Sequence, residues 1–442
     1  MKKPEMPPET NKLFVDVIEK HSPIFVVEKL TLIEPMDSKG RYLHWAELRH
    51  KPAPFGLTNE EWWLGTKLAR QFISENLPFK NITNEYFTYC IPKPLYLLIE
   101  ELQSKIDELK ETSSSMRKQY LASCLREEAI SSSQLEGAST TRLIAKQMLL
   151  EERAPVDKSE QMIFNNYHAL ELLKELKDEQ LTPQTICHIH FLLVENTLDE
   201  DKTGAYRTEN DNVIIMDHLQ SGVLHNPPPA KELQARIKSI CDFANDNETK
   251  IHPIIKAIII HFMLAYDHPF VDGNGRTARA LFYWVLINHN YHVMEFFSIS
   301  KILKEKRTAY GKAFLFTETD SNDMTYFISH QLDILKQSVQ AFEEYIERKK
   351  DAREEALISG SISNISDKLN VRQLELLIHA LEHYRFTYSI PAHAKAHGIT
   401  TETARKDLLQ LSDKYNLLKK FKDGRSYVFM SPPDLVERLS KT

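Results

Sequence analysis

Residues 268–279 read His-Pro-Phe-Val-Asp-Gly-Asn-Gly-Arg-Thr-Ala-Arg and combine side chains suited to phosphate chemistry. Arg276 and Arg279 are three residues apart, so on a helix they share a face and can bind one polyphosphate. Asp272 is a candidate Mg²⁺ ligand, because Mg²⁺ takes one or two carboxylates plus phosphate oxygens. His268, with an unperturbed pKa of about 6.5, is a candidate general base. Each residue alone has an ordinary structural explanation, but their combination indicates a polyphosphate site.

The residues between these side chains also suit an anion. Gly273 and Gly275 can take positive φ and let the backbone approach a ligand closely. Successive N–H groups in such a turn form a nest, and a second helix is expected to begin at about Arg276 with its free N–H groups aimed at the loop. Asn274 can offer its amide to a phosphate or a metal. The Lys-Ser/Thr ending of a Walker A loop is absent.

Two apolar segments, residues 254–264 and 281–287, flank this loop. A helix that is apolar nearly all round is buried at the centre of a domain. Neither segment reaches the roughly 18 to 20 residues that a membrane span needs. The sequence therefore predicts helix, tight polar loop, helix, with the loop held between two core helices and no association with a membrane.

A second candidate group stands earlier in the chain, where a helix over about 116–136 ends in three serines, Ser131 to Ser133, and then Glu136 and Gly137. Ser132 and Glu136 are four apart and share a face, and Gly137 suits a helix C-cap. A carboxylate at a helix C-terminus is disfavoured by the helix dipole, which suggests that it serves a cation elsewhere. The alternative is an ordinary frayed helix end.

The stretch 268–279 resembles the signature of the Fic family (filamentation induced by cAMP), His-x-Phe-x-Asp/Glu-Gly-Asn-Gly-Arg-x-x-Arg, at every fixed position. The resemblance implies a mainly α, Fic helical fold with a small β-hairpin flap, and transfer of AMP from ATP, with Mg²⁺, to a Tyr, Thr or Ser hydroxyl of a target protein. The implied roles are a base for His268, a Mg²⁺ ligand for Asp272, a core anchor for Phe270, orientation of the α-phosphate for Asn274, phosphate binding for Gly273, Gly275 and Arg276, and γ-phosphate binding for Arg279.

Two further segments carry the resemblance. Ser132-x-x-x-Glu136-Gly137 is similar to the family's inhibitory motif, Ser/Thr-x-x-x-Glu-Gly/Asn. This similarity implies that Glu136 pairs with Arg279 and blocks productive placement of the γ-phosphate. The segment 307–311 resembles a family Arg-x-x-Tyr-Tyr, which implies that Tyr310 stacks on adenine, although Gly311 replaces the second tyrosine.

A β-rich segment at 212–216, surrounded by Asn and Asp, predicts a hairpin. The resemblance implies that this hairpin is the flap, and that a target protein binds near Val213 to Ile215 by strand addition. The alternative is a surface hairpin without a partner. A second copy of the chain, as a homodimer, stays open as another partner.

Length and composition set the wider frame. A chain of 442 residues should hold two to four domains, and we expect an N-terminal subdomain over 1–115, a catalytic domain over 116–350 that includes the inhibitory helix at about 116–137, a linker over 351–369 and a last domain over 370–442. Aromatic clusters in the first range indicate packing on the core, or alternatively a partner site. Four scattered cysteines without a Cys-x-x-Cys pair, and an N-terminus without an apolar run, favour the cytoplasm. Cys187 and His190 fit a core helix better than a metal site.

The C-terminal segment differs from the rest in pattern and charge. From 370 the order is helix, helix, glycine turn, helix and Asp-Gly hairpin, which is typical of a winged helix-turn-helix domain. Residues 389–430 hold eight Lys/Arg and four Asp/Glu, a balance of +4 in a chain whose formal net charge is −6. DNA binding through 389–430 and a domain that only packs or binds protein both remain open.

Three functions follow as hypotheses. The first is a protein adenylyltransferase (AMPylator) that Glu136 inhibits. The second is the reverse reaction, a de-AMPylase in which Glu136 positions water. The third is a transcription regulator whose Fic domain senses nucleotide.

Overall fold

Two buried helices, α11 (Pro253–Asp267) and α12 (Asn274–Asn288), form the centre of the molecule. The structure is a computed structural model that describes residues 3–21, 23–110, 114–216, 222–291, 297–358, 365–382, 386–423 and 426–440. Every residue from 254 to 264 and from 276 to 287 is buried. The isoleucines of α11 are only moderate helix formers, so its stability comes mainly from this burial. The prediction of two core helices around a polar loop is confirmed.

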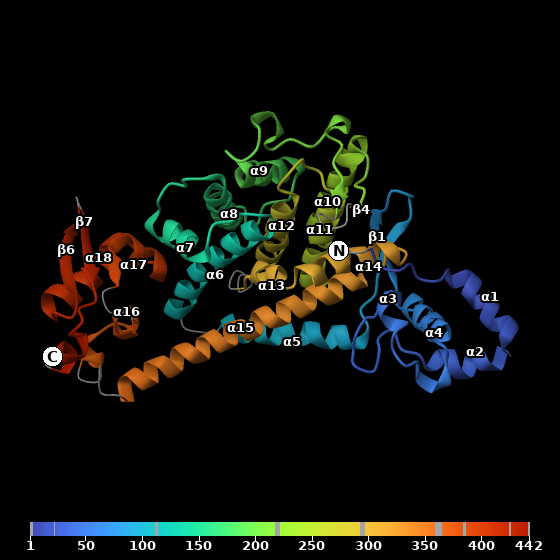
Figure 1. The fold of residues 1–442 in the computed structure, drawn as a ribbon, viewed down its shortest axis with the longest axis horizontal. Coiled ribbons are helices and arrows are strands. Elements are labelled where there is room, and N and C mark those ends of the chain that lie inside the picture. Colours follow the sequence, from blue (N-terminus) through green and yellow to red (C-terminus); the bar gives the residue numbers. More distant parts are fainter. Residues whose placement is uncertain are drawn as a thin grey trace.

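The catalytic unit surrounds this pair with further helices (Figure 1). Its core is continuous through α8, α9, α11, α12 and α15. A short antiparallel hairpin, β3 with β4, projects from it, so the expectation of a mainly helical fold with a small hairpin is confirmed. The bounds are α6 (Ser114–Leu135), α7 (Arg142–Glu151), α8 (Lys158–Glu175), α9 (Pro183–Val194), β3 (Ile215–Met216), β4 (Val223–His225), α10 (Leu233–Asn245), α13 (Ile299–Glu305), α14 (Arg307–Thr319) and α15 (Thr325–Ile358).

The expected N-terminal subdomain, 1–115, divides between two cores. Its first part has a separate core that includes Trp45, Trp62 and Trp63, built from α1 (Thr10–Lys20), α2 (Pro23–Lys29), α3 (Trp45–Leu48) and α4 (Asn59–Gln71). Its second part packs into the catalytic core, through β1 (Glu75–Lys80), β2 (Tyr86–Tyr89) and α5 (Lys93–Lys110). The aromatic side chains Tyr42, Trp45, Trp62 and Trp63 are buried, which favours packing over a partner site for these two clusters.

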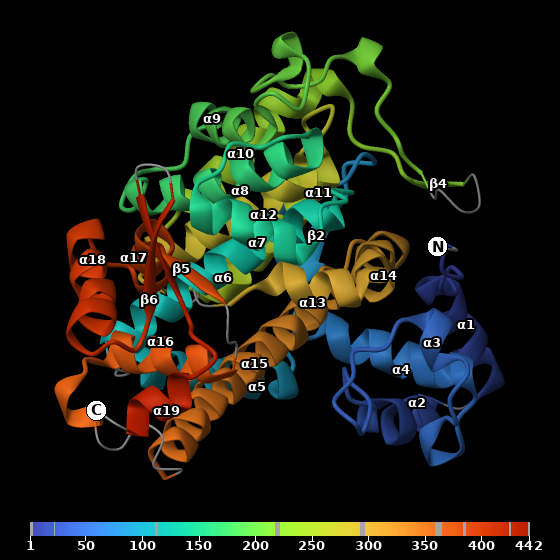
Figure 2. The same cartoon turned by 60° about the vertical axis from the view of Figure 1, so that its left-hand side comes forward.

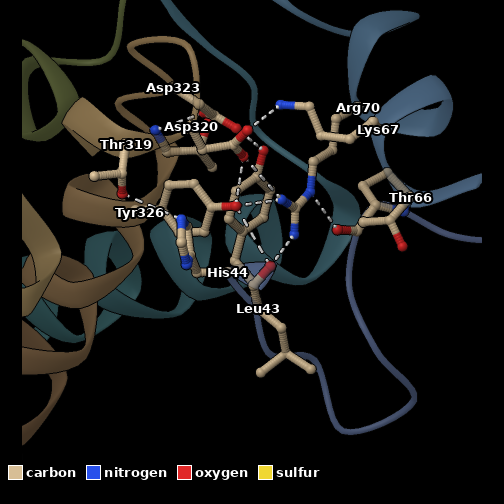
Figure 3. Close-up of polar contacts among 12 residues, drawn as sticks. Leu43, His44, Thr66, Lys67, Arg70, Thr319, Asp320, Asp323 and Tyr326 are labelled. Carbon is tan, nitrogen blue, oxygen red and sulfur yellow. Dashed lines mark hydrogen bonds and ion pairs between the residues drawn. The ribbon is translucent and has the colours of Figure 1, made fainter. Parts of the chain in front are cut away.

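A buried polar network joins the first part to α14 and α15 (Figure 3). Arg70, only 3% exposed, donates to the carbonyl of Leu43 at 2.9 Å and to the hydroxyl of Tyr326 at 2.7 Å. Tyr326 donates in turn to Asp320 at 2.8 Å, and Lys67 donates to the same carboxylate at 2.9 Å. Buried charges persist when they are paired and hydrogen-bonded in this way. The network therefore attaches α4 to the end of the catalytic unit.

Helix α15 continues to Ile358, eight residues into the range expected to be a linker, 351–369. Ile365 is buried in the core of the C-terminal unit, so that unit begins earlier than the expected residue 370. The residues 359–364 lie outside the described ranges. The helix extends past the predicted boundary because alanine, glutamate and arginine, the residues at 352–356, are good helix formers.

The C-terminal unit has its own core and a three-stranded sheet in the order β5-β7-β6. The assignment of this unit as a winged helix-turn-helix domain stays a prediction. Helix α17 packs against α6 and α7, and Lys395 on α17 lies 3.3 Å from Glu152 at the end of α7 (Figure 2). The bounds are α16 (Val371–Glu382), β5 (Thr387–Ser389), α17 (Ile390–His397), α18 (Thr401–Leu409), β6 (Lys419–Asp423), β7 (Ser426–Met430) and α19 (Leu435–Ser440).

Within the described ranges, every helix falls short of the length and apolar content that a membrane span requires.

Replacing Arg70 with methionine should destabilise the N-terminal part by about 3 kcal/mol, because a buried carboxylate and two acceptors lose their donor. Urea unfolding followed by tryptophan fluorescence measures this, since three of the four tryptophans lie in that core. Arg41→Met is the matched control, because Arg41 pairs with Asp37 at the surface and its side chain is 45% exposed. An unfolding midpoint as high in Arg70→Met as in the control contradicts the role given to the network.

Candidate active site

The loop between α11 and α12 is fixed at both ends by left-handed backbone. His268 caps α11 with φ +46°, and its N–H donates to the carbonyl of Leu264 at 3.0 Å. Gly273 caps α12 with φ +83°. A Cβ at Gly273 would come within 2.7 Å of Val194, so only glycine fits there. Helix α12 starts at Asn274, two residues before the expected Arg276.

The side chain of Asn274 closes the loop on itself. Its Oδ1 accepts from the N–H of Phe270 at 2.9 Å, and its Nδ2 donates to the carbonyl of Phe270 at 2.8 Å. Phe270 is fully buried, in agreement with its expected role as the loop's anchor. Both polar atoms of the amide therefore hold the backbone, and orientation of an α-phosphate by Asn274 stays a prediction.

His190 on α9 supports the same loop from the other side. Its ring stacks on Phe270 with a centroid separation of 3.6 Å. Nδ1 accepts from the N–H of Gly204 at 3.1 Å, so Nε2 carries the proton and donates to the carbonyl of Asp272 at 2.9 Å. Burial lowers the pKa of His190 to about 4, so the ring is neutral. Sequence reasoning placed His190 in the core but missed this contact with the loop.

The two ring nitrogens of His268 have different roles: one makes a hydrogen bond to the backbone, and the other can accept a proton. Nδ1 lies 3.3 Å from the carbonyl of Ala265, which can only accept, so Nδ1 carries the proton. Nε2 is then the unprotonated nitrogen. Burial, with the positive charge of Arg207 adding to it, lowers the pKa of His268 to about 4. The ring is therefore neutral at pH 7, as a general base must be.

Arg276 and Asp272 form the polar wall beside the start of α12. The guanidinium of Arg276 is buried, and its Nη1 donates to the carbonyl of Leu193 at 2.7 Å. Its Nε and Nη2 make no hydrogen bond within the described residues. Buried guanidinium N–H groups seldom stay unpaired, so this pair fits an anion that binds here.

The carboxylate of Asp272 is 54% exposed, and its Oδ1 accepts from the N–H of Gly273 at 2.6 Å. No group of three or more His, Cys, Asp or Glu side chains arranged to hold a metal occurs in the part of the chain that the structure describes. One exposed carboxylate next to a phosphate site is the donor set from which Mg²⁺ is bound with the help of phosphate oxygens. The residues present thus fit Mg²⁺ bound together with a nucleotide.

Arg279 and the end of α6 meet over the first turn of α12. Nη2 of Arg279 donates to Oε1 of Glu136 at 2.8 Å and to the carbonyl of Ser132 at 3.1 Å. Nε donates to the hydroxyl of Ser132 at 2.9 Å. The pairing that the sequence motif implied is present in the geometry. Gly137 follows with φ +103°, as a C-cap glycine does.

Gly275 differs from the expectation of a positive φ, because it lies inside α12 and is absent from the residues with positive φ. Its lack of a side chain has another use. A Cβ at this position would lie 2.0 Å from Oε1 of Glu136. The carboxylate of Glu136 therefore rests directly on the backbone at the start of α12.

Tyr310 on α14 lies behind Arg279 in an aromatic group. Its ring contacts His261, Phe314 and Phe327, and its hydroxyl lies 2.8 Å from Nε2 of His261. Burial raises the pKa of Tyr310 to about 12. These contacts hold the ring in the core, and stacking of Tyr310 on adenine stays a prediction.

In the chain, the hairpin of β3 and β4 lies between α9, which supports the loop, and α10. Ile214, Met216 and Val223 expose 42–48% of their surface. The described strands pair only with each other, so the outer edge of β3 has no strand partner among the described residues. Residues 217–221 lie outside the described ranges.

Comparison with known proteins gives partial matches. A family model described as "Fic/DOC family" matches residues 180–286. The protein adenylyltransferase Fic of Nematostella vectensis is 32% identical over 116 residues, 26% of this chain and 25% of the relative. The protein adenylyltransferase fic-1 of Caenorhabditis elegans is 39% identical over 66 residues, 15% of this chain and 13% of the relative. The chain spans about a quarter or less of the length of these two relatives.

A solved Fic family protein from Desulfovibrio desulfuricans shares 18% identity, with a TM-score of 0.47, over 76% of this chain and 96% of that one. The matched range 180–286 contains α9, the flap, α11, the whole loop and nearly all of α12. Over this range the chain is similar to the Fic/DOC family.

Proposed function

We propose that this chain transfers AMP from ATP to a Tyr, Thr or Ser hydroxyl of a target protein, and that Glu136 holds the enzyme inactive. The observation that carries the proposal is a neutral His268 at one end of the loop and two buried arginines beyond its other end, in the first turns of α12. Within the described residues, Nε and Nη2 of Arg276 make no hydrogen bond. The partial matches to proteins named protein adenylyltransferase support the same reaction.

The chemistry follows from these positions. Nε2 of His268 takes the proton of the target hydroxyl as its oxygen attacks the α-phosphorus of ATP. The bond from that phosphorus to the oxygen bridging to the β-phosphate breaks, and pyrophosphate leaves. Arg276 and Arg279, together with the free N–H groups of α12, hold the phosphates where negative charge grows. Asp272 would hold Mg²⁺, which supplies further neutralisation of phosphate charge when it is bound.

The inhibitory contact is electrostatic and steric. The carboxylate of Glu136 pairs with Arg279, the arginine assigned to the γ-phosphate, and lies against the backbone of Gly275. A phosphate placed there meets a negative charge and an occupied volume. The pair must break before ATP can bind productively, and this is costly because it leaves the buried guanidinium of Arg279 without its carboxylate partner.

The flap supplies a place for the target. Backbone pairing along the free edge of β3, near Val213 to Ile215, positions a hydroxyl without demanding much sequence from the target. The exposed apolar side chains on this hairpin support such an addition.

Wild type and Glu136→Gly, given Mg²⁺ and ATP labelled on either the α- or the γ-phosphate, separate the candidate reactions. We expect label on protein from the α-phosphate only, and at least about tenfold more in Glu136→Gly, since a lock worth 1.4 kcal/mol already changes a population tenfold.

Gln134→Ala is the matched control, because Gln134 lies on the same helix end but donates to Thr140 rather than to Arg279. Label from the γ-phosphate would mean a kinase. No label in either protein would reject the forward reaction, and loss of AMP from a pre-labelled target in wild type would then favour de-AMPylation.

Protonation of His268 should set the lowest pH at which the reaction keeps its full rate. The neutral ring is the active form, so the rate falls as pH falls through the pKa of His268. Because that pKa is lowered to about 4, kcat/KM in Glu136→Gly should still be near its maximum at pH about 5.5. His268→Ala should lose at least about 100-fold. An acid limb centred at about 6.5, or a His268→Ala variant with full activity, contradicts the assignment.

DNA binding by residues 389–430 is kept as a second candidate function. Arg405 and Lys406 are exposed on α18, and Lys419 and Lys422 are exposed on β6. Of the other cations in 389–430, Lys414 is also exposed, Lys395 and Lys420 pair with Glu152 and Asp413, and Arg425 lies outside the described ranges. The exposed cations support contact with a polyanion.

A labelled mixed-sequence DNA duplex tests this candidate by fluorescence anisotropy at several salt concentrations. Replacing Arg405 and Lys406 with alanine should weaken DNA binding about tenfold at low salt. The plot of log binding constant against log salt concentration should become less steep, by the equivalent of about two released counterions. Lys301→Ala with Lys312→Ala, two exposed lysines of the catalytic unit, is the control pair. Equal binding by both double variants would reject a DNA surface on α18.

A further inference from the structure

Arg207 lies at the foot of the flap and contacts the catalytic loop through backbone only. It is 7% exposed. Its Nε donates to the carbonyl of His268 at 2.7 Å, and its own N–H donates to the carbonyl of Pro269 at 2.8 Å. Its Nη2 donates to the carbonyls of Asp267 at 3.2 Å and Pro228 at 2.5 Å. One residue thus binds three consecutive carbonyls, those of residues 267–269, around the candidate base.

The position of Arg207 in the chain shows that these contacts also join the two ends of the flap. Arg207 immediately precedes the segment 208–227, which contains β3 and β4, and Pro228 immediately follows it. The guanidinium therefore joins the two ends of the flap to each other and both of them to His268. The position is also favourable for a cation, because the last carbonyls of α11 lack helical partners and carry the negative end of the helix dipole.

A second contact at the foot of the flap reinforces the first. His225, the last residue of β4, lies 2.7 Å from the carbonyl of Tyr266 through Nε2 and 2.7 Å from Glu318 through Nδ1. The carboxylate of Asp267 is paired separately, with Arg236 at 2.6 Å, so it does not compete for Arg207. The flap is thus tied to the end of α11 at two points, and Arg207 is the one that binds His268 itself.

We propose that Arg207 is a positioning residue. It sets the distance between Nε2 of His268 and the hydroxyl of a target protein bound along the flap. The proposal rests on the proposed function, because it assumes that the target binds along the flap and that His268 takes its proton. A hydroxyl must lie about 3 Å from the base, and a misplacement of about 1 Å can cost about 100-fold in rate. A link between flap and base that runs through one rigid guanidinium keeps that distance fixed.

Variants at Arg207 in the full-length Glu136→Gly chain test the proposal. Arg207→Met should lower the rate constant of labelling from α-labelled ATP about 100-fold, while the affinity for ATP with Mg²⁺ stays within about twofold. Arg207→Lys keeps the charge but not the planar fork, so it should recover only part of the rate. Added methylguanidinium should partly restore Arg207→Ala.

Arg70→Met is the matched control, because Arg70 is equally buried and also donates to backbone carbonyls, but lies in the N-terminal part. It should lose stability and keep its labelling rate at a temperature where it remains folded. If Arg207→Met keeps the parental rate, or loses ATP affinity as much as rate, the positioning role is overturned.

Titration of His268 by NMR in the same chains gives a readout that needs no activity. The charged groups that act on His268 include His225, Glu136 and Arg207. Arg207→Met removes one positive charge and frees the His268 backbone, so the pKa of His268 should rise towards 6.5 and its ring signals should shift. If the parent chain gives no label but His268 responds in this way, the proposed function fails and the link stands. Unchanged ring signals and pKa overturn the link.

Discussion

The structure depends on the packing of α11 against α12. Their apolar surfaces bury each other and the surrounding helices cover the rest, so the loop between them has ends that cannot move independently. A well-packed core resists small displacements, and a loop that spans two core helices takes on that resistance. The left-handed backbone of His268, a conformation that is costly in isolation for a residue other than glycine, is held by this frame.

The same frame carries an unusual amount of positive charge. Arg276 and Arg279 are each only 1% exposed, and Arg207 is 7% exposed. Backbone carbonyls accept from all three. Among the described residues, Arg279 also lies 2.8 Å from the carboxylate of Glu136, and Arg276 lies 3.8 Å from that of Asp272. Carbonyl dipoles hold a guanidinium in place without cancelling its charge. A site built in this way keeps its attraction for anions inside a protein interior, where electrostatic interactions are stronger than in water.

Much of this arrangement could be predicted from the sequence, because the patterns that indicate it are formed by residues close together in the chain. The apolar runs at 254–264 and 281–287, the spacing of Arg276 from Arg279 and the β-rich segment before the flap each reveal an element or a shared face. The Glu136–Arg279 pair spans 143 residues and was predictable only from two motifs taken together. His190 and Arg207 were missed as parts of the site because they bind backbone carbonyls, and a carbonyl leaves no mark on the sequence that identifies its donor. Division of residues 1–115 between two cores was also hidden, since apolar strands look alike whichever core they enter.

The bare backbone at Gly275 has a consequence for how tightly the chain can bind nucleotide. The carboxylate of Glu136 fills the volume beside it, so another anion can enter that volume only after the carboxylate has moved. Intrinsic affinity is then multiplied by the fraction of molecules in which the carboxylate has withdrawn. The competition is reciprocal, so a rising nucleotide concentration reduces the fraction of molecules in the closed form. The coupling free energy is the same one by which the closed form weakens nucleotide binding. A single missing methyl group thus makes the inhibited state that we propose depend on the concentration of nucleotide.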